Sequence, residues 1–386
     1  MTHPVSATAR QVHRQATVVD LHAHPSLKTF FSGVSFKDSQ TVNEGFKLTE
    51  LRTNYPSLLA GDIDVLCSAV YVPEKYLRHD CWVIHFGSHF IQPLKVALDG
   101  DPFDIALRVL RHMESEVAAV NAMTPAPART AAVVTSNQEL DAALGAGQLA
   151  VIHTIEGAHV LNGDVTNVAL LKAEGVASIT LAHFYPNGVA PPVEAIPKDV
   201  FLRTLRCFQF QEDLTARLPQ TGKDVVEEMY HHGVVVDLTH TTRPARRDVY
   251  AIPNPRHRPI VMSHVGAASL YAADINAYQE DIDAIRASGG VVGVIFYNYW
   301  LVNDYHRQDT LHHVVRHVRE LANTGGEDLV ALGSDWDGMT DPPNDLKEPA
   351  DWPRLTDALL AAGFTSTQVE KFLGGNARRV LRDGWG

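Results

Sequence analysis

Residues 221–240 read TGKDVVEEMYHHGVVVDLTH, a helical pattern followed by a glycine and then by a β-branched run that ends on His240. A glycine after a helix, with a strand beginning at once, is typical of an alternating α/β fold. A continuous apolar run indicates a parallel strand that is buried on both faces. This segment therefore predicts a helix and a strand, with a histidine at the strand's carboxyl end.

The same arrangement recurs along the chain. Helical patterns such as NVALLKAEG, EDIDAIRASG and HHVVRHVRELANTG alternate with apolar runs. Eight of these runs predict strands, at residues 16–24, 65–72, 149–156, 176–183, 233–240, 259–264, 290–297 and 328–335. Eight βα repeats predict an α/β fold of the (β/α)8 TIM barrel class. We expect one domain over residues 1–386, with inserted helices at about 30–129 and closing helices at the C-terminus.

The composition is typical of a soluble enzyme, with 45% hydrophobic and 20% charged residues. The net charge of −12 disfavours nucleic acid or an anionic membrane as the main partner. The chain shows no apolar leader and no stretch of membrane-spanning length. Cys67, Cys81 and Cys207 form no CxxC pair. We therefore expect reduced thiols in a cytoplasmic protein.

Polar side chains at the predicted strand ends indicate a metal centre. His22 and His24 are two residues apart on one strand, so both point to the same side and can chelate one ion. Glu156 ends another strand, where a buried carboxylate needs a cationic partner and could bridge two ions. His240 and His264 end neighbouring strands and could bind the second ion. Each residue alone would fit a loop, core or salt-bridge role, and the barrel arrangement favours metal ligands.

Other residues are candidates for acid–base chemistry and substrate contact. Asp335 ends the last predicted strand, where it can touch one ion and accept a proton from a metal-activated water. Asp337 better suits a supporting or loop role. His183 suits a hydrogen-bond donor to the scissile carbonyl, with a ligand or structural role as the alternative. Arg243 begins the next loop on the same face of the barrel and is a candidate substrate contact.

Further histidines and loops carry no independent catalytic signal. His313 and His317 are four apart on a predicted helix, but the glutamate of an HExxH motif is absent. We expect both to lie on a solvated face. The chain also lacks the GxSxG elbow of serine hydrolases.

The chain resembles the renal (membrane) dipeptidase family of the amidohydrolase superfamily. The shared pieces lie in family order between about residues 17 and 381 and include VVDLHAHP, IEGAH, TLAHF, PIVMSH, GSDWDG and GGNARRVL. The resemblance implies a barrel with two zinc ions. It also implies the following roles: Glu156 bridges the ions, His22 and Asp335 bind one, His240 and His264 bind the other, and His183 contacts the substrate's carbonyl region.

Two positions depart from the family pattern. The first motif usually reads His-x-Asp, whereas here His24 takes the place of the aspartate, so one bound ion instead of two is an alternative. The family's dipeptidases also place an arginine, usually followed by asparagine, after the strand-six histidine. Ile275 and Asn276 stand there in this chain. Binding of a substrate carboxylate is thus in doubt, unless Arg243 replaces the missing guanidinium.

We expect a metal-dependent hydrolase that cleaves a small amide or peptide bond, in a dipeptide or an N-acyl amino acid-like compound. Its cofactors would be two divalent ions, with zinc as the expected metal. The alternative is a hydrolase of a lactone or another ester on the same barrel. A non-catalytic binding protein is disfavoured, because every expected ligand position carries a metal-competent side chain. The expected partner is the small-molecule substrate, and a homodimer is one alternative for the oligomeric state.

Overall fold

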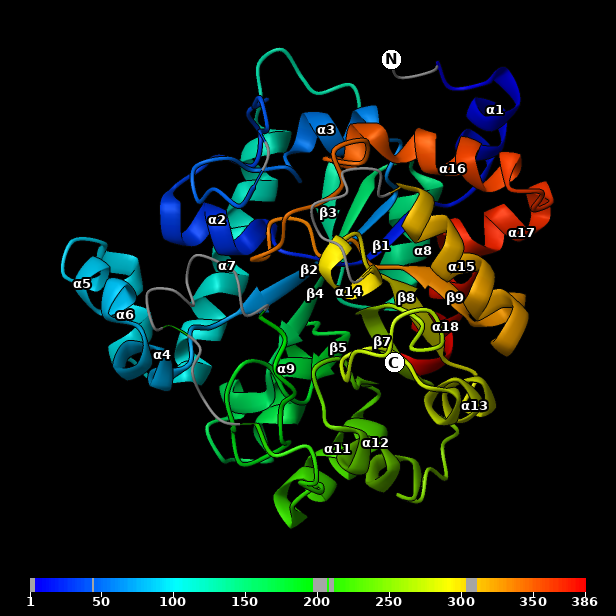
Figure 1. Ribbon diagram of the computed structural model, residues 1–386. Coiled ribbons are helices and arrows are strands. Elements are labelled where there is room, and N and C mark those ends of the chain that lie inside the picture. The colour runs from blue at the N-terminus through cyan, green and yellow to red at the C-terminus, as the bar shows by residue number, and fades with distance from the viewer. Residues whose placement is uncertain (1–3, 44, 197–206, 208–211, 303–310) are drawn as a thin grey trace.

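Eight parallel strands form a nearly closed barrel in the computed structural model, which describes residues 4–43, 45–196, 207, 212–302 and 311–386 (Figure 1). Around the barrel the strand order is β1-β2-β4-β5-β6-β7-β8-β9. Backbone hydrogen bonds between the end of β1 and the residues that follow β9 bring the first and last strands together. The strands are β1 (Val19–Ala23), β2 (Val65–Tyr71), β3 (Ala131–Val133), β4 (Leu149–Glu156), β5 (Ser178–Thr180), β6 (Val235–Asp237), β7 (Ile260–Val265), β8 (Val291–Val294) and β9 (Val330–Leu332).

The predicted barrel is confirmed, and each of the eight apolar runs overlaps one barrel strand. Several strands are shorter than their runs, because the chain turns out of the sheet before the polar residue at the run's end. β6 ends at Asp237, and His240 beyond it has a left-handed backbone with φ of 67°. The short strand β3 was not predicted. It pairs with the first part of β4 and lies outside the barrel order.

Helices surround the strands, as Figure 1 shows. The four quoted helical patterns correspond to α9, α11, α13 and α15. The helices are α1 (Ala7–Gln15), α2 (Pro25–Ser32), α3 (Tyr55–Ala60), α4 (Lys75–Asp80), α5 (Trp82–Ser88), α6 (Gln92–Asp99), α7 (Pro102–Asn121), α8 (Asn137–Gly145), α9 (Asn167–Ala173), α11 (Gln220–His232), α12 (Arg243–Tyr250), α13 (Gln279–Ala287), α14 (Asn298–Leu301), α15 (Leu311–Gly325), α16 (Trp352–Ala361), α17 (Ser366–Glu370) and α18 (Asn376–Gly384).

Local sequence explains where these helices begin and end. Asp101 caps α7 by accepting hydrogen bonds from the backbone N–H groups of Phe103 and Asp104, and Pro102 occupies the first helical position. Gly233 ends α11 with φ of 71°, and an added Cβ there would lie 2.1 Å from the carbonyl oxygen of Gly386. The glycine is therefore required both by the turn and by the close approach of the C-terminus.

Helices α4 to α7 follow β2 within the segment expected to hold inserted helices. In Figure 1, α4, α5 and α6 extend to one side of the barrel. Within the described part of the chain, none of the helices combines the length and apolarity needed to cross a bilayer.

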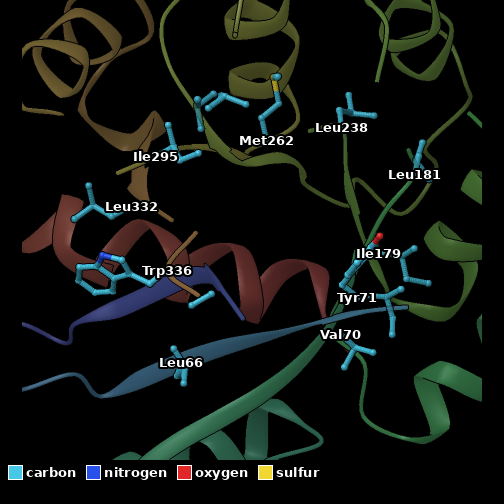
Figure 2. Packing of buried hydrophobic residues seen from close by; sticks show 14 of the residues in the cluster. Leu66, Val70, Tyr71, Ile179, Leu181, Leu238, Met262, Ile295, Leu332 and Trp336 are labelled. Atoms are coloured by element: carbon cyan, nitrogen blue, oxygen red, sulfur yellow. The ribbon is translucent and has the colours of Figure 1, made fainter. Parts of the chain in front are cut away.

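Two clusters of buried apolar side chains hold the barrel together. The larger lies around the strands and helices, and Figure 2 shows Leu66 and Val70 of β2 with Ile179 of β5 among its members. The second takes side chains from β1, β2, β4, β6, β7, β8 and β9, and includes Val65, Ile152 and the C-terminal Trp385. Together they fix the strand ends that carry the polar residues.

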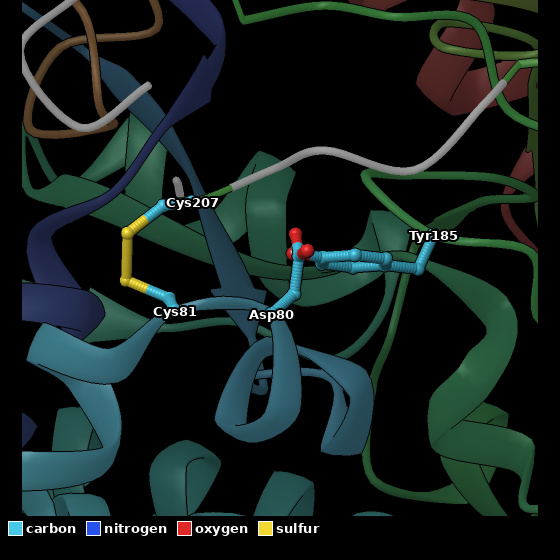
Figure 3. The surroundings of a disulfide bond; sticks show 4 residues. All are labelled: Asp80, Cys81, Tyr185 and Cys207. Atoms are coloured by element: carbon cyan, nitrogen blue, oxygen red, sulfur yellow. A yellow bond between two sulfur atoms is a disulfide. The ribbon is translucent and has the colours of Figure 1, made fainter. Parts of the chain in front are cut away.

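The expectation of three reduced cysteines is wrong for two of them. Cys81, which precedes α5, forms a disulfide with Cys207 (Figure 3). Cys67 is free and buried. The bonded residues are 126 positions apart, so their spacing gave no sign of pairing. Since disulfides are typical of oxidising compartments, the cysteines do not support the expected cytoplasmic location.

Candidate metal centre

Glu156, the last residue of β4, lies at the middle of a buried polar cluster at the carboxyl end of the barrel. Five imidazole Nε2 atoms surround its carboxylate. Their distances to the nearer Glu156 oxygen are 3.2 Å for His22, 3.3 Å for His24, 3.2 Å for His183, 3.4 Å for His240 and 3.5 Å for His264. The structure thus brings together the five predicted strand-end residues and His183.

The predicted ligands fall into two groups that share Glu156. His22 and His24 form one group, and their Nε2 atoms are 3.0 Å apart. His240 and His264 form the other, with Nε2 atoms 3.2 Å apart. Within each group the potential ligand atoms lie within 4.8 Å of one another. The geometry therefore offers two adjacent sets of nitrogen and oxygen donors around one carboxylate.

Charge and burial act against each other in this cluster. Burial would raise the pKa of Glu156, yet the surrounding imidazoles of His183, His24 and His22 hold it well below its usual range. Burial lowers the pKa of His264 well below its usual value, and the neighbouring His22 acts in the same direction. Burial also lowers the pKa of His22, but Glu156 outweighs it and raises that pKa to about 9. The carboxylate is thus ionised and stabilises positive charge beside it.

A polar network behind the cluster orients His264. The Ser263 hydroxyl donates to Asp237 Oδ2 over 2.5 Å and lies 2.8 Å from His264 Nδ1. Thr180 also donates to Asp237, over 2.9 Å. Because the serine proton goes to the aspartate, the serine oxygen can accept from His264 Nδ1–H. This arrangement leaves the lone pair of Nε2 facing Glu156.

Asp335 follows β9 and joins the cluster from the other side. Its Oδ1 is 3.2 Å from His24 Nε2, and its backbone is left-handed, with φ of 56°. The Thr340 hydroxyl donates to the Asp335 carbonyl over 2.7 Å and so holds this turn. Asp337 has a different environment, because its buried carboxylate accepts from Lys28 over 2.8 Å and from Thr53. That environment fits the supporting role expected for Asp337.

His183 lies between Glu156 and Glu74, for which the sequence predicted no role. Its Nε2 faces Glu156, while its Nδ1 is 3.3 Å from Oε1 of Glu74. Glu74 follows β2 by three residues and is buried. Glu74 comes two residues after the predicted strand at residues 65–72, and its position there did not indicate a contact with His183.

A cavity opens onto the cluster. Besides His24, Glu156, His183, His240 and Asp335, the described residues that line it are Leu27, Tyr71, Phe184, Ala195, Ile196, Tyr297, Trp300, Gly338, Met339 and Thr340. The described lining thus contains no lysine or arginine. Aromatic and aliphatic side chains form most of its wall, so the cavity offers apolar contact beside the polar cluster.

The structure does not bring Arg243 to this cavity. Its guanidinium stacks on the Tyr278 ring, 3.6 Å from the centroid, and binds Glu280 with a contact of 3.0 Å. Ile275 is buried and lines a neighbouring hollow that shares Ala195, Ile196 and Trp300 with the cavity. The geometry therefore gives no support to Arg243 as the replacement carboxylate clamp.

The expectation that His317 lies on a solvated face is wrong. The side chain is buried, its Nδ1 accepts from the backbone N–H of Ala267 over 2.8 Å, and its Nε2 is 2.9 Å from the Leu301 carbonyl oxygen. His317 therefore joins α15 to the segments after β7 and β8. The i,i+4 spacing could not distinguish this buried face from an exposed one.

Comparison with known proteins identifies the family of this arrangement. The family described as membrane dipeptidase (peptidase family M19) matches residues 6–384. An uncharacterised Klebsiella pneumoniae protein from the pqqA 5' region is 33% identical over 243 residues, which cover 61% of this chain and 83% of that protein. A dipeptidase of Claviceps purpurea is 28% identical over 237 residues, which cover 61% of this chain and 51% of the dipeptidase.

Solved structures share the fold. A metallopeptidase of Rhodobacter sphaeroides, bound to a phosphinate mimic of L-Ala-D-Ala, superimposes with a TM-score of 0.74 at 20% identity. The match covers 96% of this chain and 99% of that one. At this identity the likeness supports the barrel architecture.

Proposed function

The chain belongs to the membrane dipeptidase family of metal-dependent hydrolases, and from that premise we propose that it cleaves the amide bond of a dipeptide or similar N-acyl compound. We assign the chemistry to the cluster around Glu156. The observation that carries the proposal is the approach of His22, His24, His240 and His264 to this one buried carboxylate.

The side chains of the cluster fit two divalent ions, with zinc as the proposed metal. Imidazole nitrogens and carboxylate oxygens are ligands that zinc prefers. The Nε2 atoms of the two pairs lie 3.0 and 3.2 Å apart, so a divalent cation that displaces their protons could bind both lone pairs of a pair at once. His22 and His24 with Asp335 would hold one ion, His240 and His264 the other, and Glu156 both. Bound there, the ions would polarise the substrate carbonyl and lower the pKa of the attacking water toward about 7.

The other side chains would move protons and orient the substrate. Asp335 lines the cavity, so its carboxylate can accept the proton of the attacking water and pass it to the leaving nitrogen. His183 enters the same cavity, where the doubly protonated imidazole can donate from Nε2 to the oxygen of the scissile carbonyl while Nδ1–H faces Glu74. The apolar wall formed by Leu27, Phe184 and Met339 would exclude water from the rest of the substrate.

Two alternatives are carried into the test. Because His24 is neutral where the family usually has an aspartate, one ion could bind much more weakly than the other. A lactone or ester substrate would use the same residues, but the family match favours the amide.

The test combines metal content with hydrolysis. The protein is stripped with a chelator, dialysed, and reloaded with zinc, while bound metal is measured by mass spectrometry. We expect about two zinc ions per chain, loss of dipeptide or acyl-amide cleavage on stripping, and recovery on reloading. Activity that survives complete removal of metal would reject the proposal. Cleavage of lactones alone would reject the amide substrate and retain the metal centre.

A further inference from the structure

Glu74 is a buried carboxylate surrounded by hydrogen-bond donors. The Tyr71 hydroxyl donates to Oε2 over 2.5 Å, and the backbone N–H of Phe184 donates to Oε1 over 3.2 Å. His183 Nδ1 is 3.3 Å from the same Oε1. An ionised carboxylate can only accept hydrogen bonds, and Glu74 already accepts from the Tyr71 hydroxyl and the Phe184 N–H. The contact with His183 is therefore a hydrogen bond when Nδ1 carries a proton.

We infer that Glu74 is a positioning residue for His183. It accepts a hydrogen bond from Nδ1–H and so fixes the plane of the ring, with Nε2 pointing toward Glu156 and into the cavity. The inference rests on the proposed function, in which Nε2 contacts the scissile carbonyl. Glu74 is not among the described residues that line the cavity, and it belongs to none of the predicted ligand groups. It contacts three residues that do line the cavity, Tyr71, His183 and Phe184. Of these, His183 is the one whose side chain reaches Glu156.

Helix capping does not account for this side chain. Glu74 occupies the N-cap position of α4, yet its side chain makes no hydrogen bond to the first turn of that helix. N-cap side chains usually accept from a backbone N–H two or three residues later. Here both oxygens instead face the end of β2 and the residues after β5. The carboxylate thus serves the site and not its own helix.

Neighbouring contacts hold α4 against the segment that carries His183. The Tyr185 hydroxyl donates to Asp80 over 2.7 Å (Figure 3), and the rings of Tyr76 and Tyr185 stack with centroids 6.2 Å apart. The disulfide between Cys81 and Cys207 adds a covalent link next to α4. Since both ends of the Glu74–His183 contact are restrained, the ring orientation is set before substrate binds.

The main test is Glu74→Gln, because glutamine keeps the size of the side chain but removes the negative charge that strengthens the hydrogen bond from His183 Nδ1–H. The Tyr71 hydroxyl can rotate to accept from the new amide. We expect kcat to fall by about 10- to 100-fold, as is typical when an outer partner of a catalytic-site histidine is changed. KM should change by less than about 3-fold and bound zinc should stay constant, because the contact matters most in the transition state.

The matched control is Glu348→Gln, which changes a half-buried glutamate that accepts from Ser57 and does not line the cavity. Its kcat should equal that of the wild type. A double-mutant cycle with His183→Ala then separates positioning from general destabilisation. We expect Glu74→Gln to lower kcat much less in the His183→Ala background, because its partner is already lost.

Two outcomes overturn the inference: a wild-type kcat in Glu74→Gln, or full additivity with His183→Ala. A second measurement does not depend on that variant. In ¹⁵N-histidine-labelled wild-type protein, we expect a protected Nδ1–H resonance that disappears in His183→Gln, and its absence would also overturn the inference.

Failure of the proposed function gives a different result. If wild-type protein loaded with zinc hydrolyses no dipeptide or acyl amide, the proposed function fails. Affinity for a phosphinate pseudodipeptide, which mimics the tetrahedral transition state, still tests Glu74. We expect Glu74→Gln to weaken this binding by about 10-fold or more, and unchanged affinity would count against Glu74 alone.

Discussion

Asp335 donates its backbone N–H to the carbonyl oxygen of His22 over 2.8 Å, which joins the last barrel strand to the first at the polar cluster. His24 makes the reciprocal contact, because its N–H donates to the Trp336 carbonyl over 2.8 Å. Closure of the barrel therefore sets the distance between the proposed base and the first pair of proposed ligands. The site and the fold depend on the same few hydrogen bonds.

Asp335→Asn should lower kcat by at least about 100-fold, because asparagine cannot accept the proton of the attacking water. KM should change much less, since the proton transfer occurs in the transition state. Steady-state kinetics on zinc-loaded protein would measure both. Asp341→Asn, which changes an exposed aspartate that accepts from the Gly45 N–H, serves as the control. Unchanged turnover in Asp335→Asn with full metal content would place the base elsewhere, with His183 as the next candidate.

Glu156→Gln should release at least one ion and abolish most activity, because the neutral amide cannot balance the charge of two cations. Mass spectrometry of the purified variant gives the stoichiometry. Glu327→Gln, at an exposed ion pair with Lys371, should keep the wild-type metal content. Retention of both ions and of turnover by Glu156→Gln would remove the bridging role. If the wild-type protein binds a single ion, the neutral His24 in place of the family's aspartate would be the expected cause.

The sequence could predict the barrel and the residues at strand ends, because both follow from a repeated local pattern. Glu156 and His264 each end an apolar run, and parallel strands bring such ends together. The Glu74–His183 contact and the Cys81–Cys207 bond were missed because each joins residues more than 100 positions apart in the chain, and such contacts leave no periodic signal. The prediction of a solvated His317 was wrong because four-residue spacing places two residues on one helix face but does not indicate whether that face is buried.

Ser263→Ala should weaken zinc binding by about 10- to 100-fold, because the Ser263 hydroxyl holds the proton on His264 Nδ1 and relays the charge of Asp237. Competition with a chromogenic chelator measures the affinity without any substrate. Ser269→Ala removes an exposed hydroxyl that donates to Glu320 and should leave the affinity unchanged. Equal affinities for the two variants would show that the network contributes only to packing.

His317 should make the protein less stable in mild acid. Burial lowers its pKa from 6.5 to about 4 in the folded protein, so below pH 6.5 the unfolded state takes up the proton first. The contribution of His317 to the free energy of unfolding is fully present above pH 6.5 and is lost as the pH falls to about 4. The total loss is about 3 kcal/mol.

Urea unfolding of metal-free protein at several pH values tests this, with His317→Gln as the variant that cannot titrate. We expect the variant to lose less stability than the wild type between pH 6.5 and pH 4, whatever its stability at neutral pH. His312→Gln, at an exposed position of the same helix, should keep the wild-type profile. Parallel profiles for wild type and His317→Gln would contradict the assignment.

The leaving group of the preferred substrate should carry no free carboxylate. The described residues that line the cavity include no lysine or arginine, and Ile275 next to it is apolar and buried. Among the described lining residues a free α-carboxylate would find no cationic partner, and its loss of hydration would be costly. We therefore expect dipeptide amides and acyl amides with neutral leaving groups to have a higher kcat/KM than the corresponding free L,L-dipeptides, by about 10-fold or more.

Paired substrates that differ only in the terminal group, such as a dipeptide and its carboxamide, measure this preference directly. Arg243→Ala should leave the ratio unchanged, because the Arg243 guanidinium is engaged by Glu280 and Tyr278 away from the cavity. Efficient cleavage of free dipeptides, at kcat/KM of about 10⁴ M⁻¹s⁻¹ or above, would defeat the prediction. If Arg243→Ala then removed that activity selectively, Arg243 would have to leave Glu280 and turn into the cavity when the substrate binds.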